Sequence, residues 1–484
     1  MSTNDPKEIK VKITPRGEDF PRWYTDVIAA AEMADYSPVK GCMVIRPWGY
    51  AIWELIQKTL DGMLKKSGHE NAYFPLLIPE GFLRREAEHV EGFSPELAVV
   101  THAGGKELEE KLVVRPTSET IIYDSFAKWI HSWRDLPLLI NQWANIVRWE
   151  MRTRLFLRTT EFLWQEGHTA HATHEEAETE VKAILGIYRA LVEETMAVPV
   201  LPGVKSDGER FAGALRTYTI EAMMQDGKAL QCGTSHDLGQ NFSRAFGVKF
   251  LDQEGKEQLV WQTSWGVSTR LIGALIMVHG DDRGIVLPPP VAPLQAVIVP
   301  IWRNDAQRGE LTAAAHRLAK GLEEEGIRCR VDDRDVRPAW KYYEWERKGV
   351  PVRVEIGPRD AEQNQVVVVR RDTNEKSAFP QAELPALLKK TLGDIQTALF
   401  RRAANFREEN TFDAKTWEEF TGIIGGMGGF VRASWCGAAA CEARIKSETK
   451  ATIRCIPSDA TQTPGACISC GAPSTLRPVF ALSY

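Results

Sequence analysis

Apolar side chains recur at helical spacing in two segments of the first half of the chain. Tyr50–Lys66 is predicted to be an amphipathic helix that ends before Gly68. A second helix is expected to begin near Thr173, where Glu176 has the spacing of a capping box. The short apolar run Ala72–Ile78 predicts a strand. The two apolar faces comprise Ile52, Leu55, Ile56, Leu60, Met63 and Leu64 in the first helix, and Val181, Ile184, Leu185, Tyr188 and Leu191 in the second.

Beyond residue 290, short β-branched runs alternate with helical segments. This alternation predicts an α/β domain of mostly parallel strands, followed by a helical pattern over Leu384–Arg407. The expected strands are Ala296–Trp302, Arg328–Asp332, Val350–Ile356 and Gln365–Arg370, and the expected helices are Glu310–Glu325 and Ala339–Lys348.

The chain divides where this pattern changes. Its 484 residues suggest about three domains. Leu287–Pro290 ends in a run of prolines, which cannot continue a helix or a central strand. The expected domains are residues 1–287, 288–400 and 401–484, which together make a multi-domain α/β protein.

The composition is that of a globular protein, with 43% hydrophobic residues, 26% charged residues and a formal net charge of −5. An RNA-binding surface on such a chain has to be a local basic face, because the overall charge is negative. Residues Met1–Arg16 are polar and do not resemble a signal peptide. The longest apolar run, Leu271–Val278, is far shorter than the ~20 residues of a membrane span. We therefore expect a cytoplasmic protein without a membrane partner.

A dense group of arginines begins within Val147–Glu150. Guanidinium groups stay charged and bind phosphate through paired hydrogen bonds. The nearby Phe162 offers a face on which adenine can stack. The same pattern also fits a solvated basic strand and turn. The arginines are Arg148, Arg152, Arg154 and Arg158.

This segment resembles motif 2 of the class II aminoacyl-tRNA synthetases, in which Arg-x-Glu, a loop and Arg-x-x-x-Phe follow one another. The resemblance implies a catalytic domain built on an antiparallel sheet. It also implies that Arg148 contacts the ATP α-phosphate and the amino-acid carboxylate, and that Arg158 binds the γ-phosphate. Glu150 is expected beside the adenine and Phe162 stacked on it, with Thr159 also in the ATP site.

Two further segments resemble the other motifs of this class. Ser264–Arg270 precedes an apolar helix and is similar to motif 3, whose Arg270 is expected to cover the second face of the adenine and act in catalysis with Arg148 and Arg158. The helix Tyr50–Lys66 and the segment after it resemble motif 1, which forms the homodimer interface in this class, although an ordinary amphipathic helix has the same spacing. The three motifs span about 41–79, 147–166 and 264–290.

The segment Arg115–Thr120 resembles a Thr-x-Glu loop specific to the prolyl-tRNA synthetases. By that resemblance Glu119 accepts from the secondary ammonium of proline and Thr117 assists, although the same residues also fit the start of a helix. Phe162–His168 and Gln231–His236 resemble the family's pocket wall and its Gly-Thr-Ser-His strand. The resemblance therefore adds Arg148, Trp164, Glu166, His168 and His236 to the proline site, and Gln231 and Thr234 to the ATP site.

The resemblance covers nearly the whole chain and is closest to the archaeal/eukaryotic-like form of the family. It implies a proline–tRNA ligase that activates L-proline with ATP and Mg²⁺ and transfers it to the 3′ end of proline tRNA. Another bacterial form carries a domain-sized editing insert between motifs 2 and 3. Residues 167–264 leave no room for one here, so we expect no hydrolysis of alanyl-tRNA by this chain.

The α/β domain after Pro290 resembles the class IIa anticodon-binding domain, on the strength of Tyr343–Pro351. Arginine side chains suit the O6/N7 edge of guanine, which the proline anticodon presents. The expected anticodon residues are Glu346, Arg353 and Arg359, although each could equally belong to a surface salt-bridge network.

The end of the chain is rich in cysteine. Two close pairs in a reducing compartment predict a closed, structural four-thiolate Zn²⁺ site in a small C-terminal α/β domain, with free thiols as the alternative. The resemblance places Cys455 outside the metal site and implies that Tyr484 folds back toward the active site. The expected ligands are Cys436, Cys441, Cys467 and Cys470.

Three other interpretations explain less of the sequence. A catalytically silent RNA-binding paralogue is disfavoured because the motif arginines are present. A synthetase for threonine is expected to hold zinc inside the catalytic domain, where Cys232 lacks recognisable partners. A purely structural zinc protein explains only the last segment of the chain.

Overall fold

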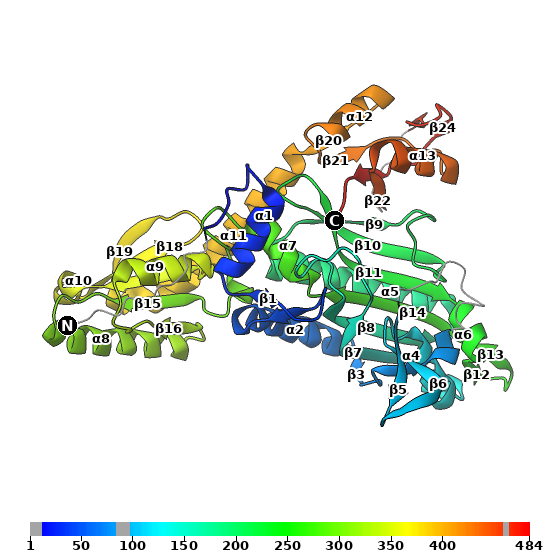
Figure 1. Cartoon of the computed structure of the whole chain (residues 1–484), viewed down its shortest axis with the longest axis horizontal. Coiled ribbons are helices and arrows are strands. Elements are labelled where there is room, and N and C mark those ends of the chain that lie inside the picture. Colours follow the sequence, from blue (N-terminus) through cyan, green and yellow to red (C-terminus); the bar gives the residue numbers. More distant parts are fainter. Residues whose placement is uncertain (1–11, 84–96, 458–463) are drawn as a thin grey trace.

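The computed structural model describes residues 12–83, 97–457 and 464–484. A large sheet with its helices forms one end of the elongated molecule, and a smaller α/β unit forms the other (Figure 1). The long helix α11 (Leu384–Glu409) leads from the α/β unit to the C-terminal elements, which lie against the large sheet. None of the helices in the described residues combines the length and apolarity that a bilayer crossing requires.

The central sheet has eleven strands, and its middle is antiparallel, as the motif resemblance implied. Only the edge strand β3 is parallel to its neighbour β7 on that side. In spatial order the strands are β20 (Thr411–Asp413), β21 (Phe430–Arg432), β25 (Val479–Ala481), β22 (Thr452–Pro457), β9 (Val200–Val204), β10 (Arg216–Met223), β11 (Ala229–Gly239), β14 (Trp261–Ser268), β8 (Glu161–His171), β7 (Leu138–Val147) and β3 (Glu70–Asn71).

Helix α5 (His174–Ala190) begins at the expected capping box, in which the Thr173 hydroxyl accepts from Glu176 N and the Glu176 carboxylate accepts from Thr173 N. Helix α2 (Pro47–Lys66) starts three residues before the expected Tyr50, because proline is well suited to the first helical turn. These helices and α7 (Arg270–His279) enclose the main apolar core with the sheet.

The strand expected over Ala72–Ile78 is wrong. Only β3 and the short β4 (Leu77–Pro79) form in this region. Between them Phe74 N donates to the side chain of Gln142, and Pro75 has no N–H to offer a ladder. The remaining elements of this unit are α1 (Phe20–Ala30), β1 (Ala34–Tyr36), β2 (Met43–Ile45), β5 (Ala98–Ala103), β6 (Lys106–Val114), α4 (Glu119–Trp129), α6 (Asn241–Phe246), β12 (Lys249–Leu251) and β13 (Glu257–Leu259).

The second unit contains the expected strands and helices, but its sheet is only half parallel. Strand β15 pairs in parallel with β16 and β17, whereas β18 is antiparallel to β17, and an unexpected β19 is antiparallel to β18. Short connections on either side of β18 reverse the chain, which a parallel pairing would not allow. The elements are β15 (Ala296–Pro300), α8 (Asp305–Glu324), β16 (Cys329–Val331), α9 (Pro338–Arg347), β17 (Val352–Ile356), α10 (Pro358–Glu362), β18 (Gln365–Arg370) and β19 (Lys376–Pro380).

The two expected domain divisions are not breaks in the packing. Pro288 and Pro289 are buried, and the Pro289 carbonyl accepts from Arg328 Nη2 at 2.9 Å. The division after residue 400 falls inside the continuous helix α11. We therefore place the start of the C-terminal unit after Glu409.

The C-terminal unit extends the catalytic sheet through the pairing of β22 with β9. Beneath this junction Glu221 is fully buried and accepts from Lys205 Nζ at 2.7 Å and from Arg454 Nη2 at 2.9 Å. The unit also contains α12 (Trp417–Gly425), α13 (Ala439–Thr449), β23 (Gly465–Ala466) and β24 (Pro473–Ser474).

Candidate active site

Four neighbouring strands place four of the expected site residues in two adjacent rows across one face of the sheet. Directly opposed residues in an antiparallel sheet share a face and have Cβ atoms roughly 5 Å apart. The first row consists of Thr234, Gly266, Glu166 and Gln142, and the second of His236, Ser264 and His168. The strand register thus brings together segments that are far apart in the sequence.

The two oxygens of Glu166 are fully engaged at the back of the site. Oε1 accepts from Gln142 Nε2 at 2.8 Å and from the Ser118 hydroxyl, and Oε2 lies 3.0 Å from His168 Nε2. His168 Nδ1 lies 3.1 Å from the Tyr123 hydroxyl. Burial alone raises the pKa of Glu166, but the bonds from His168 and its other donors outweigh burial and hold the pKa below its ordinary value. Glu166 is therefore a buried carboxylate that stays ionised.

Glu119 begins helix α4 and is buried, and its carboxylate accepts from the Thr117 hydroxyl. Nearby, Arg148 Nε donates to the Pro116 carbonyl at 3.0 Å. Burial lowers the pKa of Arg148, and the charges of Glu119, Glu166 and Glu150 oppose that shift. The Thr-x-Glu loop and the motif 2 arginine thus lie in one electrostatic environment.

The motif arginines come from three segments. Arg270 Nε, at the start of α7, donates to the Leu157 carbonyl at 3.2 Å. Burial lowers the pKa of Arg270, and the positive charges of Arg148 and Arg158 lower it further. Arg158 is exposed and donates to Glu150 Oε2 at 2.7 Å. Guanidinium groups that repel one another in this way are the arrangement that a bound polyphosphate stabilises.

Aromatic rings border these arginines. The Arg148 guanidinium lies 5.7 Å from the centre of Phe162 and 5.6 Å from that of Trp164. The two rings meet edge to face at 6.0 Å. Trp164 Nε1 and Ser264 Oγ are buried without a hydrogen-bond partner, so the site offers two polar atoms to a ligand.

Sequence reasoning missed Phe211, whose ring lies 4.6 Å from that of His236. The Thr217 hydroxyl accepts from Phe211 N at 2.9 Å and lies 3.0 Å from His236 Nδ1, so one hydroxyl holds both residues. Burial lowers the pKa of His236 to about 3, which keeps its imidazole neutral. No local pattern marks Phe211, but Ser264 could have been inferred from its register between His168 and His236.

Two expected ATP-site residues are less directly connected. The Thr159 hydroxyl donates to the Glu161 carbonyl at 2.7 Å, which is a local backbone contact. Gln231 lies beside a β-bulge opposite Glu221, three residues before Thr234 on β11. Both flank the site, and among the described residues neither is hydrogen-bonded to the motif arginines.

Comparison with known proteins identifies the family. Residues 100–279 match the tRNA synthetase class II core domain (G, H, P, S and T), residues 295–391 an anticodon binding domain, and residues 417–484 the prolyl-tRNA synthetase C-terminal domain. The proline–tRNA ligase of Chlorobaculum tepidum is 58% identical over 98% of this chain and 99% of its own length. The chain belongs to the prolyl-tRNA synthetase family.

Other members are nearly as similar. The proline–tRNA ligase of Roseiflexus castenholzii is 57% identical over 98% of this chain and 100% of its own length. The chloroplastic/mitochondrial proline–tRNA ligase of Arabidopsis thaliana is 56% identical over 98% of this chain and 88% of its own length. The class II core, the anticodon-binding domain and the family's C-terminal domain are therefore all present in this prolyl-tRNA synthetase family member.

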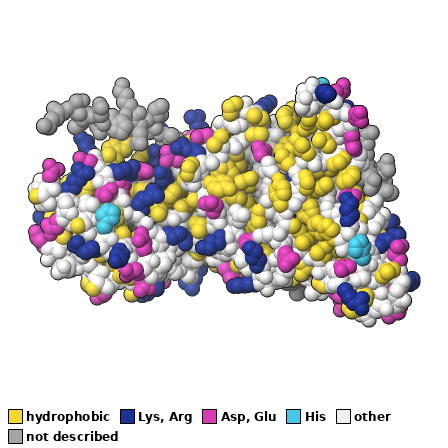
Figure 2. Space-filling model, turned by 90° about the horizontal axis from the view of Figure 1, so that it is seen from below, with side chains coloured by type: hydrophobic (Ala, Val, Ile, Leu, Met, Phe, Trp, Pro, Cys, Tyr) yellow, Lys and Arg dark blue, Asp and Glu magenta, His cyan; other side chains and the backbone are white. Residues whose placement is uncertain are grey.

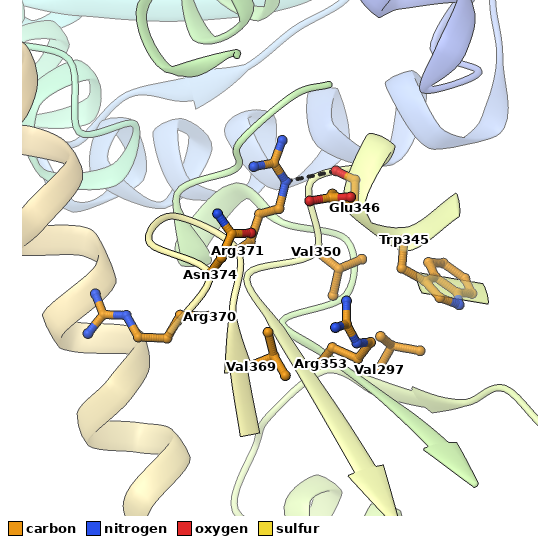
Figure 3. A pocket seen from close by; sticks show the side chains of 9 residues that line it. All are labelled: Val297, Trp345, Glu346, Val350, Arg353, Val369, Arg370, Arg371 and Asn374. Carbon is orange, nitrogen blue, oxygen red and sulfur yellow. Dashed lines mark hydrogen bonds between the residues drawn. The ribbon is translucent and has the colours of Figure 1, made fainter. Parts of the chain in front are cut away.

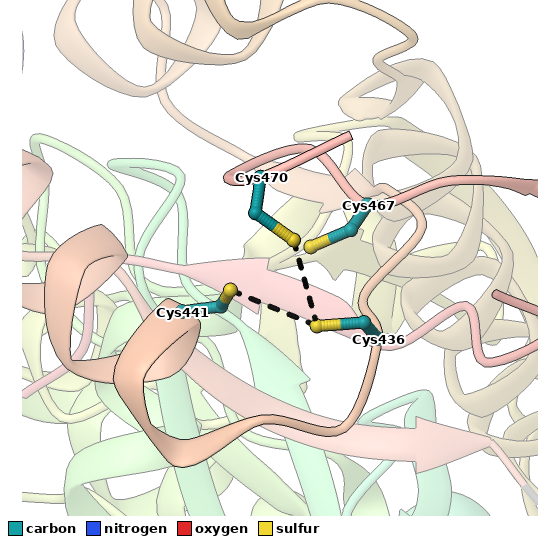
Figure 4. A group of neighbouring side chains, drawn as sticks. All are labelled: Cys436, Cys441, Cys467 and Cys470. Carbon is teal, nitrogen blue, oxygen red and sulfur yellow. Dashed lines mark hydrogen bonds between the residues drawn. The ribbon is translucent and has the colours of Figure 1, made fainter. Parts of the chain in front are cut away.

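The four expected cysteine ligands converge in the C-terminal unit, and their sulfur atoms all lie within 4.8 Å of one another (Figure 4). Cys436 Sγ is 3.6 Å from Cys441 Sγ and 3.8 Å from Cys470 Sγ. Tetrahedral Zn²⁺ with bonds of about 2.3 Å places its sulfur ligands about 3.8 Å apart. The four thiols therefore fit zinc, and Cys455 lies outside the group, on β22.

A small pocket at one edge of the α/β unit contains two of the expected anticodon residues, Glu346 and Arg353 (Figure 3). Arg371 Nε donates to the Glu346 carbonyl at 2.8 Å. The Glu346 carboxylate pairs with Arg283 at 2.7 Å, and Arg353 pairs with Glu355 at 3.0 Å. In the free chain both residues therefore belong to salt bridges, as the alternative interpretation expected. Arg359 lies on α10, is exposed and does not line this pocket.

The terminal Tyr484 packs beside the motif 2 loop. Its hydroxyl donates to Asp226 Oδ2 at 2.6 Å, and the Arg154 guanidinium lies 5.4 Å from its ring centre. Tyr484 N donates to the Ala229 carbonyl at 3.2 Å, at the start of β11. The chain therefore does return to the catalytic sheet.

Proposed function

We propose that this chain activates L-proline with ATP and transfers it to the 3′ end of proline tRNA. The observation that carries the proposal is the placement of Arg148 between the Thr117–Glu119 loop and Arg270. One guanidinium there can hold the amino-acid carboxylate and the α-phosphate together, because its donors form a rigid fork.

Proline binds over the two rows of sheet residues. Glu119 accepts from the secondary ammonium, since among the described residues the Thr117 hydroxyl is the one donor to its carboxylate, whereas Glu166 already has three hydrogen-bond partners. Trp164, His168 and the neutral His236 surround the pyrrolidine ring, and Phe211 covers it. A neutral imidazole suits this wall because it adds no positive charge beside the ammonium.

ATP binds beside the arginines as its Mg²⁺ complex. Arg158 and Arg270 hold the γ-phosphate, Phe162 and Arg270 enclose the adenine, and Glu150 lies beside it. Thr159, Gln231 and Thr234 complete the nucleotide site. Glu150 now pairs with Arg158, and we expect this pair to open when the triphosphate arrives.

The reaction needs positioning more than covalent catalysis. A carboxylate oxygen of proline attacks the α-phosphorus, the bond to the bridging oxygen breaks, and pyrophosphate leaves. Arg148 and Arg270 stabilise the charge that develops on the phosphoryl oxygens. In the second step a ribose hydroxyl at the tRNA 3′ end attacks the prolyl carbonyl and AMP leaves.

We further propose that the chain lacks an editing insert and belongs to the archaeal/eukaryotic-like form of the family. Residues 167–264 supply the end of β8, α5, β9, β10, β11 and α6, which belong to the catalytic core. A pocket rejects a smaller apolar substrate only weakly, by ~1–3 kcal/mol per methylene. Alanyl-tRNA made in error is therefore expected to persist in the presence of this chain alone.

The tRNA anticodon binds the α/β unit. Glu346 and Arg353 read base edges, which requires their present ion pairs to exchange for contacts with RNA. Arg359, which is exposed on α10, is the third residue proposed to read a base edge. Charging of a transcript whose proline anticodon has been replaced tests this assignment, and normal charging contradicts it.

The chain works as a homodimer through the motif 1 region. Figure 2 shows hydrophobic side chains gathered on the face of the catalytic unit seen from below. Exposed large apolar residues of the catalytic unit include Tyr50, Tyr73, Leu77, Val99 and Trp129. A contiguous apolar patch on a folded protein marks an interaction surface.

The four cysteines hold a structural Zn²⁺, which stabilises the C-terminal unit and leaves no position open for catalysis. Thiolate ligands of this kind are kept reduced in the cytoplasm, where we place the protein.

The function is tested by charging purified proline tRNA with labelled proline, threonine or alanine. Proline is expected to be transferred with the highest kcat/KM. Transfer of threonine in preference to proline contradicts the proposal.

A further inference from the structure

The segment from Lys205 to Leu215, here called the pocket loop, joins β9 to β10 and carries Phe211. Two turns shape it, with Glu209 N donating to the Ser206 carbonyl at 3.1 Å and Ala214 N donating to the Phe211 carbonyl at 3.0 Å. Its inner end is fixed to the sheet, because the Thr217 hydroxyl bonds both Phe211 N and His236 Nδ1.

The outer end of the pocket loop is held by a different part of the chain. The buried Ser206 hydroxyl donates to Glu442 Oε1 at 2.5 Å, and Lys446 Nζ pairs with Glu209 Oε1 at 3.0 Å. Glu442 and Lys446 are four residues apart on α13, so they share one face of that helix. A Cβ at Gly208 would lie 3.1 Å from Glu442 Oε2, so the loop backbone packs directly on this carboxylate.

Helix α13 also begins at the cysteine cluster. Cys441 lies in its first turn, next to Glu442, and no side chain caps the helix at Ala438. One short helix therefore contacts the four-cysteine site on one side and the pocket loop on the other. Because Cys441 and Glu442 are neighbours in the first turn of α13, a displacement of the start of this helix would move both contacts.

We propose that Glu442 is a positioning residue for the amino-acid pocket. It holds the pocket loop so that Phe211 closes against His236, and through it the cysteine-rich unit sets the affinity for the amino acid. The inference rests on the proposed placement of proline beside His236. The proposal predicts that loss of Glu442 raises the KM for proline and not the KM for ATP, since no contact of this loop reaches Arg158 or Arg270 among the described residues.

The test compares Glu442→Ala, Glu442→Gln and Ser206→Ala in the full chain. Glutamine can still accept from Ser206, so E442Q is expected to stay within about twofold of the unchanged chain. Loss of a hydrogen bond to a charged group is expected to raise the KM for proline about tenfold in E442A. The KM for ATP is expected to stay within about twofold, because the nucleotide site is not part of the loop.

Glu448→Gln is the matched control. Glu448 lies on the same helix, pairs with Arg444 at 2.9 Å and does not contact the loop. E448Q is expected to leave both KM values, zinc content and hydrogen exchange of residues 205–215 unchanged. E442A is expected to retain zinc and to speed exchange in residues 205–215.

The double variant E442A/F211A tests whether Glu442 acts on proline binding through Phe211. If Glu442 acts through Phe211, the double variant has nearly the KM for proline of F211A alone. An E442A chain with unchanged KM for proline overturns the proposal, as does one whose KM values for proline and ATP rise together with loss of zinc. If F211A leaves the KM for proline unchanged while E442A still loosens the loop, the placement of proline is wrong and the proposal falls with it.

Discussion

His168 Nε2 lies 3.0 Å from Glu166 Oε2, and both side chains are almost fully buried. The imidazole is itself held by the Tyr123 hydroxyl at 3.1 Å. With Gln142 and Ser118 on its other oxygen, both oxygens of Glu166 are already held by buried side chains. We therefore propose that Glu166 supports the amino-acid site and that Glu119 is the carboxylate that receives the substrate.

The two carboxylates should respond differently to neutralisation. Glu166→Gln disrupts a buried hydrogen-bond network and is expected to lower stability by about 2–3 kcal/mol. Glu119→Gln is expected to lower kcat/KM for proline at least about tenfold with a smaller change in stability. Thermal unfolding and pyrophosphate exchange measure the two effects, with exposed Glu175→Gln as the control. Equal effects of both variants on both assays would contradict this division of roles.

Replacement of Arg148 or Arg270 by lysine should already impair the activation of proline. A lysine keeps the charge but loses the planar fork, so each substitution is expected to reduce kcat/KM for pyrophosphate exchange about 100- to 1,000-fold. The control is Arg244→Lys, which changes an exposed arginine on α6 of the same unit. Full activity of R148K would show that the guanidinium does not bridge the two substrates.

Each chain is expected to bind one Zn²⁺, released on titration of its thiols with a mercurial. Replacement of Cys470 by serine should lower bound zinc to a small fraction of one equivalent, because a structural site needs all four ligands. Cys42→Ser, which lies far from the cluster in the sequence and outside it in space, should keep full zinc. Retention of zinc by C470S would mean that another residue completes the site.

The free energy of unfolding should fall as the pH is lowered, because the buried His279 resists protonation in the folded chain. Burial lowers the pKa of His279 to about 3, and its Nε2 lies 2.9 Å from the Met196 carbonyl oxygen. Between pH 6.5 and about 3 the unfolded chain binds a proton that the folded chain does not. The free energy of unfolding therefore falls by ~1.4 kcal/mol per pH unit in this window, and the contribution is complete above pH 6.5.

Urea unfolding at several pH values measures this slope. His279→Gln should lower the slope by ~1.4 kcal/mol per pH unit, which corresponds to one proton. Substitution of the exposed His316 by glutamine should leave the slope unchanged. Identical slopes for both variants would assign the acid sensitivity to other groups.

The contact between the catalytic and α/β units should matter more for tRNA than for activation. Arg371 Nη1 and Nη2 each donate to Asp281 at 2.7 Å, and Arg371 is buried. Asp281→Asn removes this pairing at the end of α7 and is expected to lower kcat/KM for tRNA about tenfold while exchange changes less than about threefold. Asp394→Asn on the surface of α11 is the control. Parallel loss of both activities in D281N would indicate general unfolding instead.

Local signals in the sequence predicted local structure well. The Thr173 and Glu176 capping box needs only four neighbouring residues, and helix α5 begins there. The class of the fold, the two arginine motifs and the cysteine cluster also followed from short patterns. Each of these patterns is short, although the structure is what brings separate patterns together, as it does for the cysteine pairs Cys436/Cys441 and Cys467/Cys470.

Features set by distant contacts could not be predicted. The pairing of β22 with β9 joins residues that lie about half of the chain apart. The hydrogen bond from Ser206 to Glu442 spans 236 positions, and no local pattern in either segment predicts it. The helical pattern over Leu384–Arg407 did predict α11, which ends at Glu409, but it did not show that the expected domain division after residue 400 lies inside this helix.

The central claim is tested most directly by exchange of labelled pyrophosphate into ATP with each of the twenty amino acids in turn. The account predicts a dominant signal with proline, which depends on Arg148 and Glu119. A dominant signal with another amino acid, or none with any from a folded, zinc-loaded chain, would contradict it.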